Sequence, residues 1–466
     1  MNARCHRILF NRTRGLPMVV AETARAHDTH GKGQAFSPPA APTRDDWPSR
    51  YRRPVALAML LAFSNQYLVA PAHAQIVAYK AAPAKQRPTV LNASNGVALI
   101  NIQTPSAAGV SHNLYDQFDV SAQGAILNNS QGNTQTQLGG WVQGNPMLAA
   151  GSARVILNEV VTAAPSQLHG HIEVAGSPAQ VVIANPAGIT CNGCGFINAI
   201  RTTLTTGSPL ITHGTLNGYR VEGGAIRIEG AGMDTRSASY TDLIARAVQI
   251  NAGLWAQTLT VSTGAHIADA TLTHFTPLAP APDTTPSFAI DVASLGGMYA
   301  GKIKLVGTET GVGVRNAGHI GASAGEVHVT ADGRLENIGS ISAASDINIT
   351  TRTAILSTGT LSAGSDLRLS ADTLELAGST HSARKLSFTA HAGHIDLSNS
   401  TNHADDTLTA HSAQALIHSG AQSHAKQLEL TAHSLDNRLG RIVQTGGGNT
   451  AITLTGKGSS RATRVT

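Results

Sequence analysis

The chain has 466 residues, of which only 13% are charged and 4% aromatic, and it contains 47 glycines. So little charge excludes a solvated disordered chain, whereas abundant Gly with Thr, Ser, Ala and Ile is typical of many short strands joined by tight turns. The net charge of +5 is concentrated at the start, because residues 1–74 hold ten basic and four acidic side chains and the remainder holds 23 and 24. Without clustered Lys and Arg, residues 75–466 are not expected to bind nucleic acid.

An export signal is predicted over residues 1–74. A charged segment at 50–53 precedes the short apolar segment Val55–Phe63, and Ala72-His73-Ala74 has the small-x-small pattern of a cleavage site before Gln75. The apolar segment is too short for a transmembrane helix, and no other window has the ~18 consecutive apolar residues that a membrane span needs. We therefore expect cleavage between Ala74 and Gln75 and no stable membrane span.

The first half of the exported chain predicts short strands with a loose period. They are expected at residues 98–102, 125–127, 153–157, 171–174, 180–184, 225–228, 247–250 and 258–261. The segment at 276–286 contains four Pro residues and predicts a loop or linker. We place a provisional domain boundary there, with one domain at 75–286 and a regular stalk at 287–466.

Two cysteines remain after the signal, Cys191 and Cys194, separated by Asn192-Gly193. A CxxC pair in a cytosolic βαβ protein would indicate a redox centre, but no helical pattern follows and export leads to an oxidising compartment. A disulfide across a tight Asn-Gly turn is favoured, with a modest entropic effect because the loop is short. A zinc site would need two further ligands at matching spacing, and we expect no metal and no cofactor.

The second half repeats with a period of about twenty residues. Strand-like pairs begin at Val327, Ile347, Leu367, Leu386, Leu408 and Leu428, and a second apolar series runs through Leu335, Ile355, Leu374, Ile395, Leu416 and Leu435. Two apolar series with one period define one supersecondary unit per repeat, and a single unit cannot bury its apolar face. The expected fold is all-β, a right-handed parallel β-helix with coils of roughly 20 residues.

Glycines share the same phase as the apolar series. Gly318, Gly339, Gly359, Gly378 and Gly420 recur at one position of the repeat, where we expect corners with positive φ. Helical solenoids are excluded because they need longer repeats and a 3.6-residue apolar period. Leucine-rich repeats are excluded because their Leu-x-x-Leu-x-Leu pattern and Asn ladder are absent.

Three segments resemble the filamentous haemagglutinins, the exported partners of two-partner secretion systems. They are residues 113–120, residues 144–148 and residues 181–198, and the extended leader at 1–33 matches the same pattern. That family has an Asn-Pro-Asn-Leu and an Asn-Pro-Asn-Gly-Ile motif. The corresponding residues are Asn145, Pro146, Met147 and Leu148, followed by Asn185, Pro186, Ala187, Gly188 and Ile189. The third residue departs from the family in both motifs, and turn formation at β-helix corners is the competing interpretation of both.

The resemblance implies a mechanism and partners. The chain would be captured, while extended, by the periplasmic domains of an outer-membrane β-barrel transporter, and would fold coil on coil outside. It would then be secreted or displayed on the surface of a Gram-negative bacterium as an adhesin-like protein. Host-cell glycans or receptors would be its outer partners, although no sequence motif identifies them.

Catalysis is the rival class. His391, His411 and His433 are spaced in repeat phase, which predicts a polar line on an outer face, with metal or proton binding as the alternative. Polysaccharide-cleaving enzymes use β-helices with paired carboxylates, and Asp405-Asp406 is the one adjacent acidic pair of the stalk. No GxSxG, HExxH or P-loop is present. We therefore expect no enzyme.

Two alternatives share the same N-terminal domain within the family. One is the N-terminal part of a secreted haemolysin, and the other is the N-terminal part of a contact-dependent growth-inhibition toxin. Because family members are usually much longer and no amphipathic cap follows residues 451–455, we expect a truncated chain or a fragment.

Overall fold

The computed structural model describes residues 6–11, 16–21, 75–279, 286–456 and 460–462. Within the leader it describes strands β1 (His6–Asn11) and β2 (Leu16–Ala21), which form an antiparallel hairpin. This hairpin belongs to a unit at residues 1–70 that is separate from the unit at 71–466. The predicted charged and apolar signal segments and Ala74 lie outside the described residues, and Gln75 opens the described part of the second unit.

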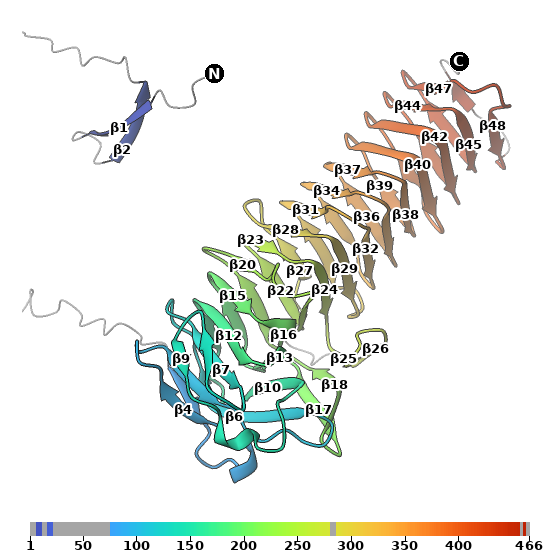
Figure 1. Cartoon of the computed structure of the whole chain (residues 1–466). Helices are drawn as coiled ribbons and strands as arrows, with labels where there is room; N and C mark the ends of the chain where they lie inside the picture. The colour runs from blue at the N-terminus through green and yellow to red at the C-terminus, as the bar shows by residue number, and fades with distance from the viewer. Residues whose placement is uncertain (1–5, 12–15, 22–74, 280–285, 457–459, 463–466) are drawn as a thin grey trace, which may run out of the picture. The chain divides into compact units, whose positions relative to one another are not determined.

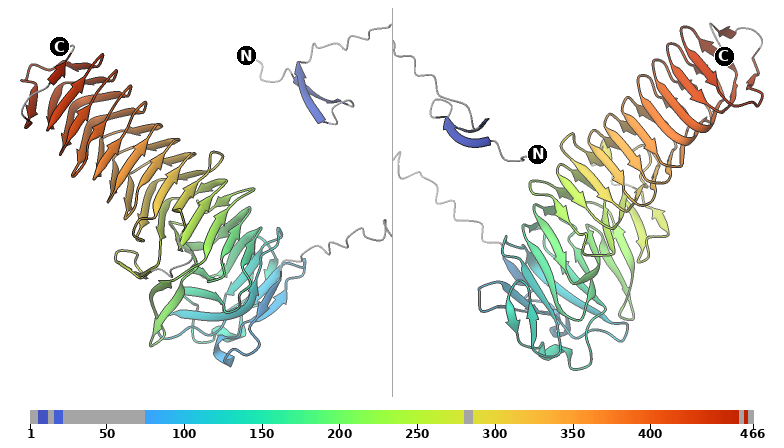
Figure 2. Two further views of the ribbon diagram at one scale, coloured as in Figure 1. Left: turned by 180° about the vertical axis from the view of Figure 1, so that it is seen from behind. Right: turned by 45° about the horizontal axis from the view of Figure 1, so that its top comes forward.

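The second unit is a β-solenoid of about 13 turns, and the structure is 58% strand and 2% helix. Figures 1 and 2 show the strands of successive coils side by side along one axis. This confirms the predicted all-β parallel β-helix. The mean coil is about 22 residues long, slightly longer than expected from the repeats. Within the described part of the chain, no helix is long and apolar enough to cross a membrane.

Three parallel stacks of strands make the walls of the solenoid, and two of them merge into one 28-stranded sheet through the long strands β40 and β42. The first stack is β6 (Val110–Phe118), β10 (Val155–Val160), β13 (Ala179–Ala184), β16 (Ala199–Thr205), β21 (Tyr240–Ala245), β24 (Thr258–Thr263), β29 (Lys302–Gly307), β32 (Val327–Ala331), β35 (Ile347–Thr351), β38 (Asp366–Ala371), β40 (Thr380–Ala390), β42 (Thr401–Ser412), β45 (Gln427–Ala432) and β48 (Ala451–Leu454). The second stack is β5 (Ala98–Asn101), β7 (Ala125–Asn129), β12 (His171–Gly176), β15 (Cys194–Ile197), β20 (Met233–Asp234), β23 (Gly253–Trp255), β28 (Gly297–Ala300), β31 (His319–Ala322), β34 (Ser340–Ala343), β37 (Thr360–Ala363), then β40 and β42, β44 (Gln422–Ala425) and β47 (Arg441–Gln444). The third stack is a separate sheet of β11 (Ser166–Leu168), β14 (Ile189–Cys191), β19 (Ala225–Ile228), β22 (Ala247–Ile250), β27 (Phe288–Val292), β30 (Gly313–Asn316), β33 (Leu335–Asn337), β36 (Ala354–Ser357), β39 (Thr373–Glu375), β41 (Ile395–Asp396), β43 (Ala415–Ile417), β46 (Ser434–Asn437) and β49 (Ser460–Ala462).

The two predicted apolar series are interior columns of this solenoid. The series from Val327 to Leu428 pairs in register through the first stack, and the series from Leu335 to Leu435 pairs in register through the third. All of these residues are at most 4% exposed. Side chains alternate between the two faces of a strand, so each coil contributes its apolar face to one continuous core.

Antiparallel insertions explain the loose period of the first half. Strands β17 (Ser208–Thr212), β18 (Thr215–Val221), β25 (His266–Asp269) and β26 (Phe275–Pro277) form an antiparallel sheet outside the coil path. The Pro-rich segment begins in the last two residues of β26, and residues 280–285 lie outside the described part. Parallel pairing of β22 with β27 carries the third stack across this insertion. The core therefore continues across residue 286. The domain boundary placed there stays a prediction.

Antiparallel strands also cover the first coils. Strand β3 (Ile76–Ala78) pairs with β6, and β4 (Thr89–Asn92) pairs with β5. The one-turn helix η1 (Ala84–Gln86) joins them, and the hairpin of β8 (Thr134–Thr136) and β9 (Gly140–Val142) lies beside the second stack. Strands that run against the coil direction remove the open edge that a first coil would otherwise present.

The prediction of positive φ at the repeated glycines is wrong for three of the five. Only Gly378 and Gly420 have positive φ, at 73° and 68°. Gly339 and Gly359 are required for close packing instead, because a Cβ on either would lie 2.0 Å from the carbonyl oxygen of the equivalent glycine in the preceding coil. The same holds for Gly318, whose Cβ would lie 2.1 Å from the carbonyl oxygen of Gly296.

Candidate functional site

The first Asn-Pro motif forms a closed turn after β9. Asn145 is 2% exposed and caps the short helix η2 (Pro146–Leu148) by accepting a hydrogen bond from the Met147 backbone N–H at 3.0 Å. Its amide nitrogen donates to the carbonyl oxygens of Ile102 and Asn128, each at 2.9 Å. The Leu148 N–H donates to the Asn145 carbonyl at 3.1 Å, and the Leu148 side chain is fully buried.

The second motif repeats this geometry at the end of β13. Asn185 is fully buried, and its side-chain oxygen accepts from the Ala187 N–H at 2.9 Å. Its amide nitrogen donates to the Ala164 carbonyl at 2.9 Å and to the Ser166 hydroxyl at 3.0 Å. The Gly188 N–H then donates to the Asn185 carbonyl at 3.0 Å.

The last two residues of this motif lead into the next wall. Gly188 has φ of 119°, a conformation that L side chains rarely adopt, and a Cβ there would lie 3.1 Å from the Ala225 carbonyl oxygen. Ile189 is 1% exposed and begins β14. The motif therefore closes a corner of the solenoid and returns the chain to its core.

In both motifs the third residue contributes its backbone rather than its side chain. Met147 is 38% exposed and Ala187 is exposed, while each backbone N–H binds the motif asparagine. The departures from the family pattern at these two positions leave the turns intact for this reason. Pro146 and Pro186 are exposed as well, so each turn presents its Pro and third residue outward.

A disulfide between Cys191 and Cys194 lies six to nine residues beyond the start of the second motif. Cys191 ends β14 and Cys194 begins β15, and their sulfur atoms are bonded with the Cα atoms 5.4 Å apart. Both cysteines are at most 1% exposed. The bond spans the corner between the third and second stacks, where Gly193 has φ of 82°.

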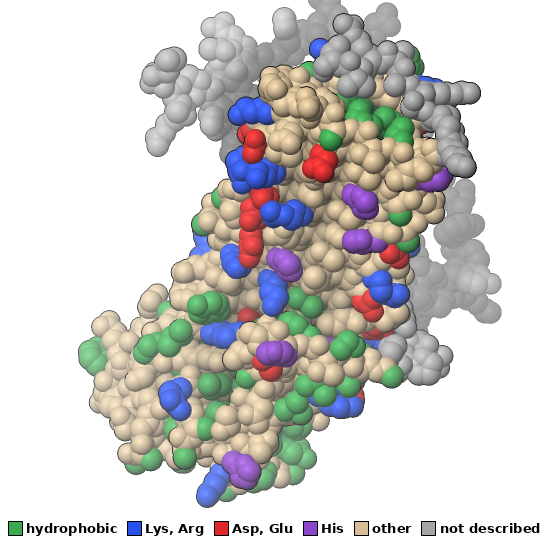
Figure 3. Space-filling model, turned by 90° about the vertical axis from the view of Figure 1, so that its right-hand side faces the viewer, with side chains coloured by type: hydrophobic (Ala, Val, Ile, Leu, Met, Phe, Trp, Pro, Cys, Tyr) green, Lys and Arg blue, Asp and Glu red, His purple; other side chains and the backbone are tan. Residues whose placement is uncertain are grey.

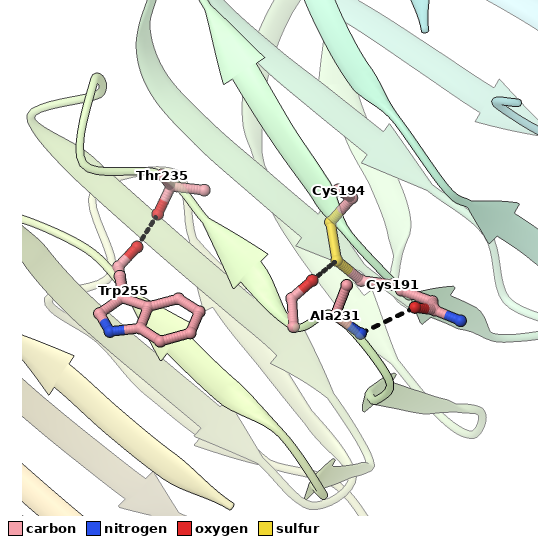
Figure 4. The surroundings of a disulfide bond; sticks show 7 residues. Cys191, Cys194, Ala231, Thr235 and Trp255 are labelled. Atoms are coloured by element: carbon pink, nitrogen blue, oxygen red, sulfur yellow. Dashed lines mark hydrogen bonds between the residues drawn. A yellow bond between two sulfur atoms is a disulfide. The ribbon is translucent and has the colours of Figure 1, made fainter. Parts of the chain in front are cut away.

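The next coil holds this corner in place (Figure 4). The Gly193 N–H donates to the Gly232 carbonyl at 2.7 Å, and the Cys191 sulfur lies 3.4 Å from the same oxygen. The Asn192 side chain accepts from the Ala231 N–H at 2.9 Å. The disulfide and these contacts fix one corner geometry and leave no free thiol in it.

The polar partners inside the coils were not predicted from the sequence. The carbonyls and hydroxyl that receive the two motif asparagines lie up to 43 residues away along the chain. Neighbouring interior amides behave in the same way, because Asn129 donates to the carbonyls of Ala153 and Ser177. A period that is broken by insertions does not reveal such pairs.

The comparisons with known proteins match this arrangement. A family model described as the TPS secretion domain, TPS denoting two-partner secretion, matches residues 74–337. The chain belongs to the two-partner secretion exoproteins. This is the family of the filamentous haemagglutinins, and the crystal structure of a filamentous haemagglutinin secretion domain is similar at 30% identity and a TM-score of 0.51, over 67% of this chain and 96% of that one.

Two further family models match the remaining parts. An extended signal peptide of type V secretion systems matches residues 1–43, and haemagglutinin repeats match residues 322–398 and 381–459. The signal and the secretion domain indicate a secreted or surface-exposed exoprotein of Gram-negative bacteria. The matched TPS domain is a secretion domain and not a catalytic domain.

Curated relatives are much longer than this exoprotein. It is 52% identical over 344 residues to "Toxin CdiA" of Yersinia pestis, covering 74% of this chain and 10% of that protein. It is 46% identical over 352 residues to "tRNA nuclease CdiA-2" of Burkholderia pseudomallei strain 1026b, covering 74% of this chain and 11% of that protein. The chain therefore spans about a tenth of the length of these relatives.

The three histidines predicted to share a line are exposed but not aligned. Pairing of β40 with β42 and of β42 with β45 sets His411 opposite Thr389 and Thr431. His391 and His433 fall two positions away from that column. The spacing of the histidines differs from the strand register in both steps, because β40 and β42 pair at an offset of 22 residues there and β42 and β45 at 20, while the histidines are 20 and 22 residues apart.

The adjacent acidic pair lies at a register shift between β40 and β42. Asp405 is 3.2 Å from the His403 ring, and Asp406 is 3.8 Å from Arg384 and 4.0 Å from Lys385. Figure 3 shows Lys and Arg beside Asp and Glu on one face of the solenoid, rather than gathered by sign. Within the residues that the structure describes, no three His, Cys, Asp or Glu side chains are grouped so as to hold a metal ion.

Proposed function

We propose that the exported part of this exoprotein is handed to a dedicated outer-membrane β-barrel transporter, whose periplasmic domains capture it while it is extended. The observation that carries the proposal is the match of the secretion domain to residues 74–337, behind a matching extended signal and ahead of haemagglutinin repeats. The solenoid geometry supports vectorial folding. Each coil pairs only with its neighbours, so coils can add one by one as the chain emerges.

The N-terminal end supports the direction of this process. Strands β3 and β4 run against the first coils and cover them, so the first coils can close without a preceding one. The two Asn-Pro turns and the disulfide follow within the next coils. A folded nucleus of this kind on the outer side would draw the remaining chain outward by adding coils, and each new coil adds parallel pairing to the last.

Fractionation tests the export route. The full chain is produced in a Gram-negative host with and without the transporter from a neighbouring gene, and its amount is measured in medium, cell surface, periplasm and cytoplasm. We expect the chain in the medium or on the surface only when the transporter is present. Retention in the periplasm with a functional transporter would overturn the proposal.

The Asn-Pro motifs contribute to export chiefly through the turns that they hold. This view is supported by the burial of both asparagines and by the use of backbone atoms alone at Met147 and Ala187. Export of Met147→Ser and Ala187→Ser should equal that of the parent chain, whereas Asn145→Ala and Asn185→Ala should be exported poorly. Loss of export in the two exposed variants, with folding unchanged, would instead indicate direct contact with the transporter.

On the outside, we propose an adhesin-like protein whose partners are host-cell glycans or receptors. Its support is the match to haemagglutinin repeats and the long described surface with mixed charge. Binding of the exported chain to host cells, compared with a transporter-deficient strain, tests this role. Equal binding by both strains would overturn it.

A second candidate is the N-terminal part of a contact-dependent growth-inhibition toxin, with a haemolysin as a third. The names "Toxin CdiA" and "tRNA nuclease CdiA-2" of relatives that share this region favour the toxin over the haemolysin. Co-culture with sensitive cells distinguishes them, because inhibition of neighbours is expected of a toxin and lysis of erythrocytes of a haemolysin. Turnover of an acidic polysaccharide by the purified chain would instead favour the polysaccharide-cleaving enzyme.

A further inference from the structure

A row of rings crosses three neighbouring coils on the outer side of the second stack. The rings of Trp255 in β23 and Tyr299 in β28 are nearly parallel, at 16°, with centroids 6.1 Å apart. The ring of His319 in β31 follows at 5.4 Å from that of Tyr299 and 31° to it. Figure 1 shows these strands as successive rungs of one face. The chain has only three Trp and seven Tyr residues. The presence of Trp255 and Tyr299 side by side on one outer face therefore suggests a function for this face.

Glycines two positions away allow these rings to lie along their own strands. A Cβ on Gly253 would come within 2.4 Å of the Trp255 ring, and one on Gly297 within 2.7 Å of the Tyr299 ring. In β31 the order is reversed: Gly321 follows His319 by two positions, and a Cβ on it would come within 2.8 Å of the His319 ring. The register sets His319 opposite Gly297 and Gly321 opposite Tyr299. Each strand therefore pairs one ring with one glycine, and any larger residue would displace the rings from the row.

The rings line a groove of about 370 Å³. Buried alanines at 256, 300 and 322 lie along it, and Ser323 and Ser342 supply hydroxyl groups. The groove thus combines an aromatic wall, a small-residue lining and hydrogen-bonding groups. Ligand sites typically combine mostly apolar surface with a few placed polar groups.

An ion pair closes one end of the groove. The Arg236 guanidinium donates to both carboxylate oxygens of Asp234, at 3.0 Å from Nε and 2.6 Å from Nη2. The Arg236 carbonyl accepts from the Gln257 side chain at 2.8 Å. At the other end His319 shares a hydrogen bond with the Ser340 hydroxyl. The charges of the ion pair cancel, so the groove offers both donors and acceptors without net charge.

We infer that this groove is a binding subsite for a neutral β-linked oligosaccharide. Pyranose rings have apolar C–H faces that pack on aromatic rings, and hydroxyl groups that bond to donors and acceptors at their edges. The ring spacing of 6.1 and 5.4 Å is close to the advance of an extended β-linked sugar chain per residue. An acidic polysaccharide fits less well, because the carboxylate of Asp234 neutralises Arg236.

The subsite would give the proposed adhesin-like role a specific class of ligand. It rests on the proposed function in one respect, because the chain must reach the outer surface to meet that ligand. Binding is therefore measured on the purified full chain, independently of the transporter. Failure of export in the fractionation experiment leaves this measurement unaffected, and failure to bind leaves the export route unaffected.

Calorimetric titration with cellohexaose and with N-acetylchitohexaose tests the subsite, with a heparin hexasaccharide and a proline-rich peptide as comparators. The variants are Trp255→Leu and Tyr299→Leu, which keep apolar cover over the glycines and remove the ring. Trp141→Leu is the matched control, because Trp141 is 71% exposed and lies outside the groove. Thermal unfolding of each variant reports folding separately.

We expect the parent chain and Trp141→Leu to bind at least one neutral hexasaccharide equally. Each ring variant should bind roughly tenfold more weakly, the loss expected when one stacking contact is removed. Three outcomes would overturn the inference. They are no binding of either neutral sugar, binding of heparin or peptide alone, and undiminished binding in both ring variants, which would assign the ring row to coil stacking only.

Discussion

At the scale of single residues, the two motif asparagines replace missing backbone partners at solenoid corners. Each one closes its own turn through its side-chain oxygen and ties that turn to earlier coils through its amide nitrogen. A buried polar group is costly when its partner is lost, since the orphaned donor or acceptor cannot reach water. Asn is therefore required because its side chain both donates and accepts hydrogen bonds. Met147 and Ala187, the third residues of the motifs, contribute only backbone N–H groups to these turns.

Asn185→Ala should destabilise the solenoid by about 2–3 kcal/mol, because it leaves the Ala187 N–H and the Ala164 carbonyl without their partner. Ala187→Asn, which restores the family residue at an exposed position, should change stability by less than about 0.5 kcal/mol. Urea unfolding followed by far-UV circular dichroism measures both. Equal stabilities of the two variants would contradict this account.

At the scale of elements, stacking imposes demands that differ from those of an isolated turn. Gly318, Gly339 and Gly359 are small because the carbonyl of the preceding coil approaches them closely, while their φ values are ordinary. A repeat of glycine in the sequence does not distinguish these two causes. Only the spacing between coils decides which one applies.

Gly339→Ala should therefore destabilise the stalk by more than about 2 kcal/mol, since the new methyl group would meet the Gly318 carbonyl oxygen at 2.0 Å. Gly448→Ala is the control, because nothing lies within 4 Å of its Cβ position and its φ is not positive. That variant should be neutral or slightly stabilising. Thermal melts of both variants compare them, and an unchanged midpoint for Gly339→Ala would refute the close-approach explanation.

The second stack changes character in its last coils. Its interior column is apolar through Ile341 and Leu361, then continues with His381, Asn402 and Ser423 before returning to Ile442. A chain of hydrogen bonds joins these polar residues to their neighbours, and it runs from Ser379 through His381, Asn402, Ser423 and His418 to Asn437. Inside a solenoid, a polar column is stable only when each member is satisfied by the next.

Acid should weaken this column. Burial lowers the pKa of His381 to about 4 and lowers the pKa of His418, while an unfolded histidine titrates near pH 6.5. Below pH 6.5 the unfolded state binds more protons than the folded state, so stability is full above that pH and falls as the pH drops toward 4. The expected loss is about 1.4 kcal/mol per pH unit for His381 between pH 6.5 and 4, and His418 adds a loss in the same direction.

Urea unfolding of the parent chain and of His381→Gln between pH 7.5 and 4.5 measures this loss. The difference in stability between the two chains should shrink as the pH falls, because the variant lacks one titrating group. His433→Gln, at an exposed position, is the matched control for the removal of one imidazole from the surface. A His381→Gln curve parallel to the parent curve would show that the buried column does not titrate in this range.

At the scale of the whole molecule, the sequence predicts the regular part and not the insertions. The columns from Val327 to Leu428 and from Leu335 to Leu435 follow from the period alone, because each coil there repeats at 19 to 22 residues. The sheet of β17, β18, β25 and β26 and the covering strands β3 and β4 break that period. Their antiparallel pairing depends on which segments meet in space, which a repeat pattern does not contain.

The candidate site also has a part that the sequence predicts and a part that it does not. Turn formation at both Asn-Pro segments follows from local chemistry, since Asn and Pro favour turns by themselves. The partners of Asn145 and the ring row of Trp255 and Tyr299 come from coils separated by tens of residues and by inserted segments. Alignment across coils, and not residue type, assembles these features.

A solenoid held by nearest-neighbour contacts should also lose stability locally. Leu361 is fully buried in β37 between β34 and β40, and Leu361→Ala should cost about 2–5 kcal/mol. Hydrogen exchange followed by mass spectrometry should show faster exchange in those three strands and unchanged exchange in β7 and β12, where no contact with the altered coil exists. Ile172→Ala in β12 is the matched variant and should give the reverse pattern. Uniformly faster exchange in both variants would mean that the coils unfold as one cooperative unit, and outward addition of one coil at a time would then lose its physical basis.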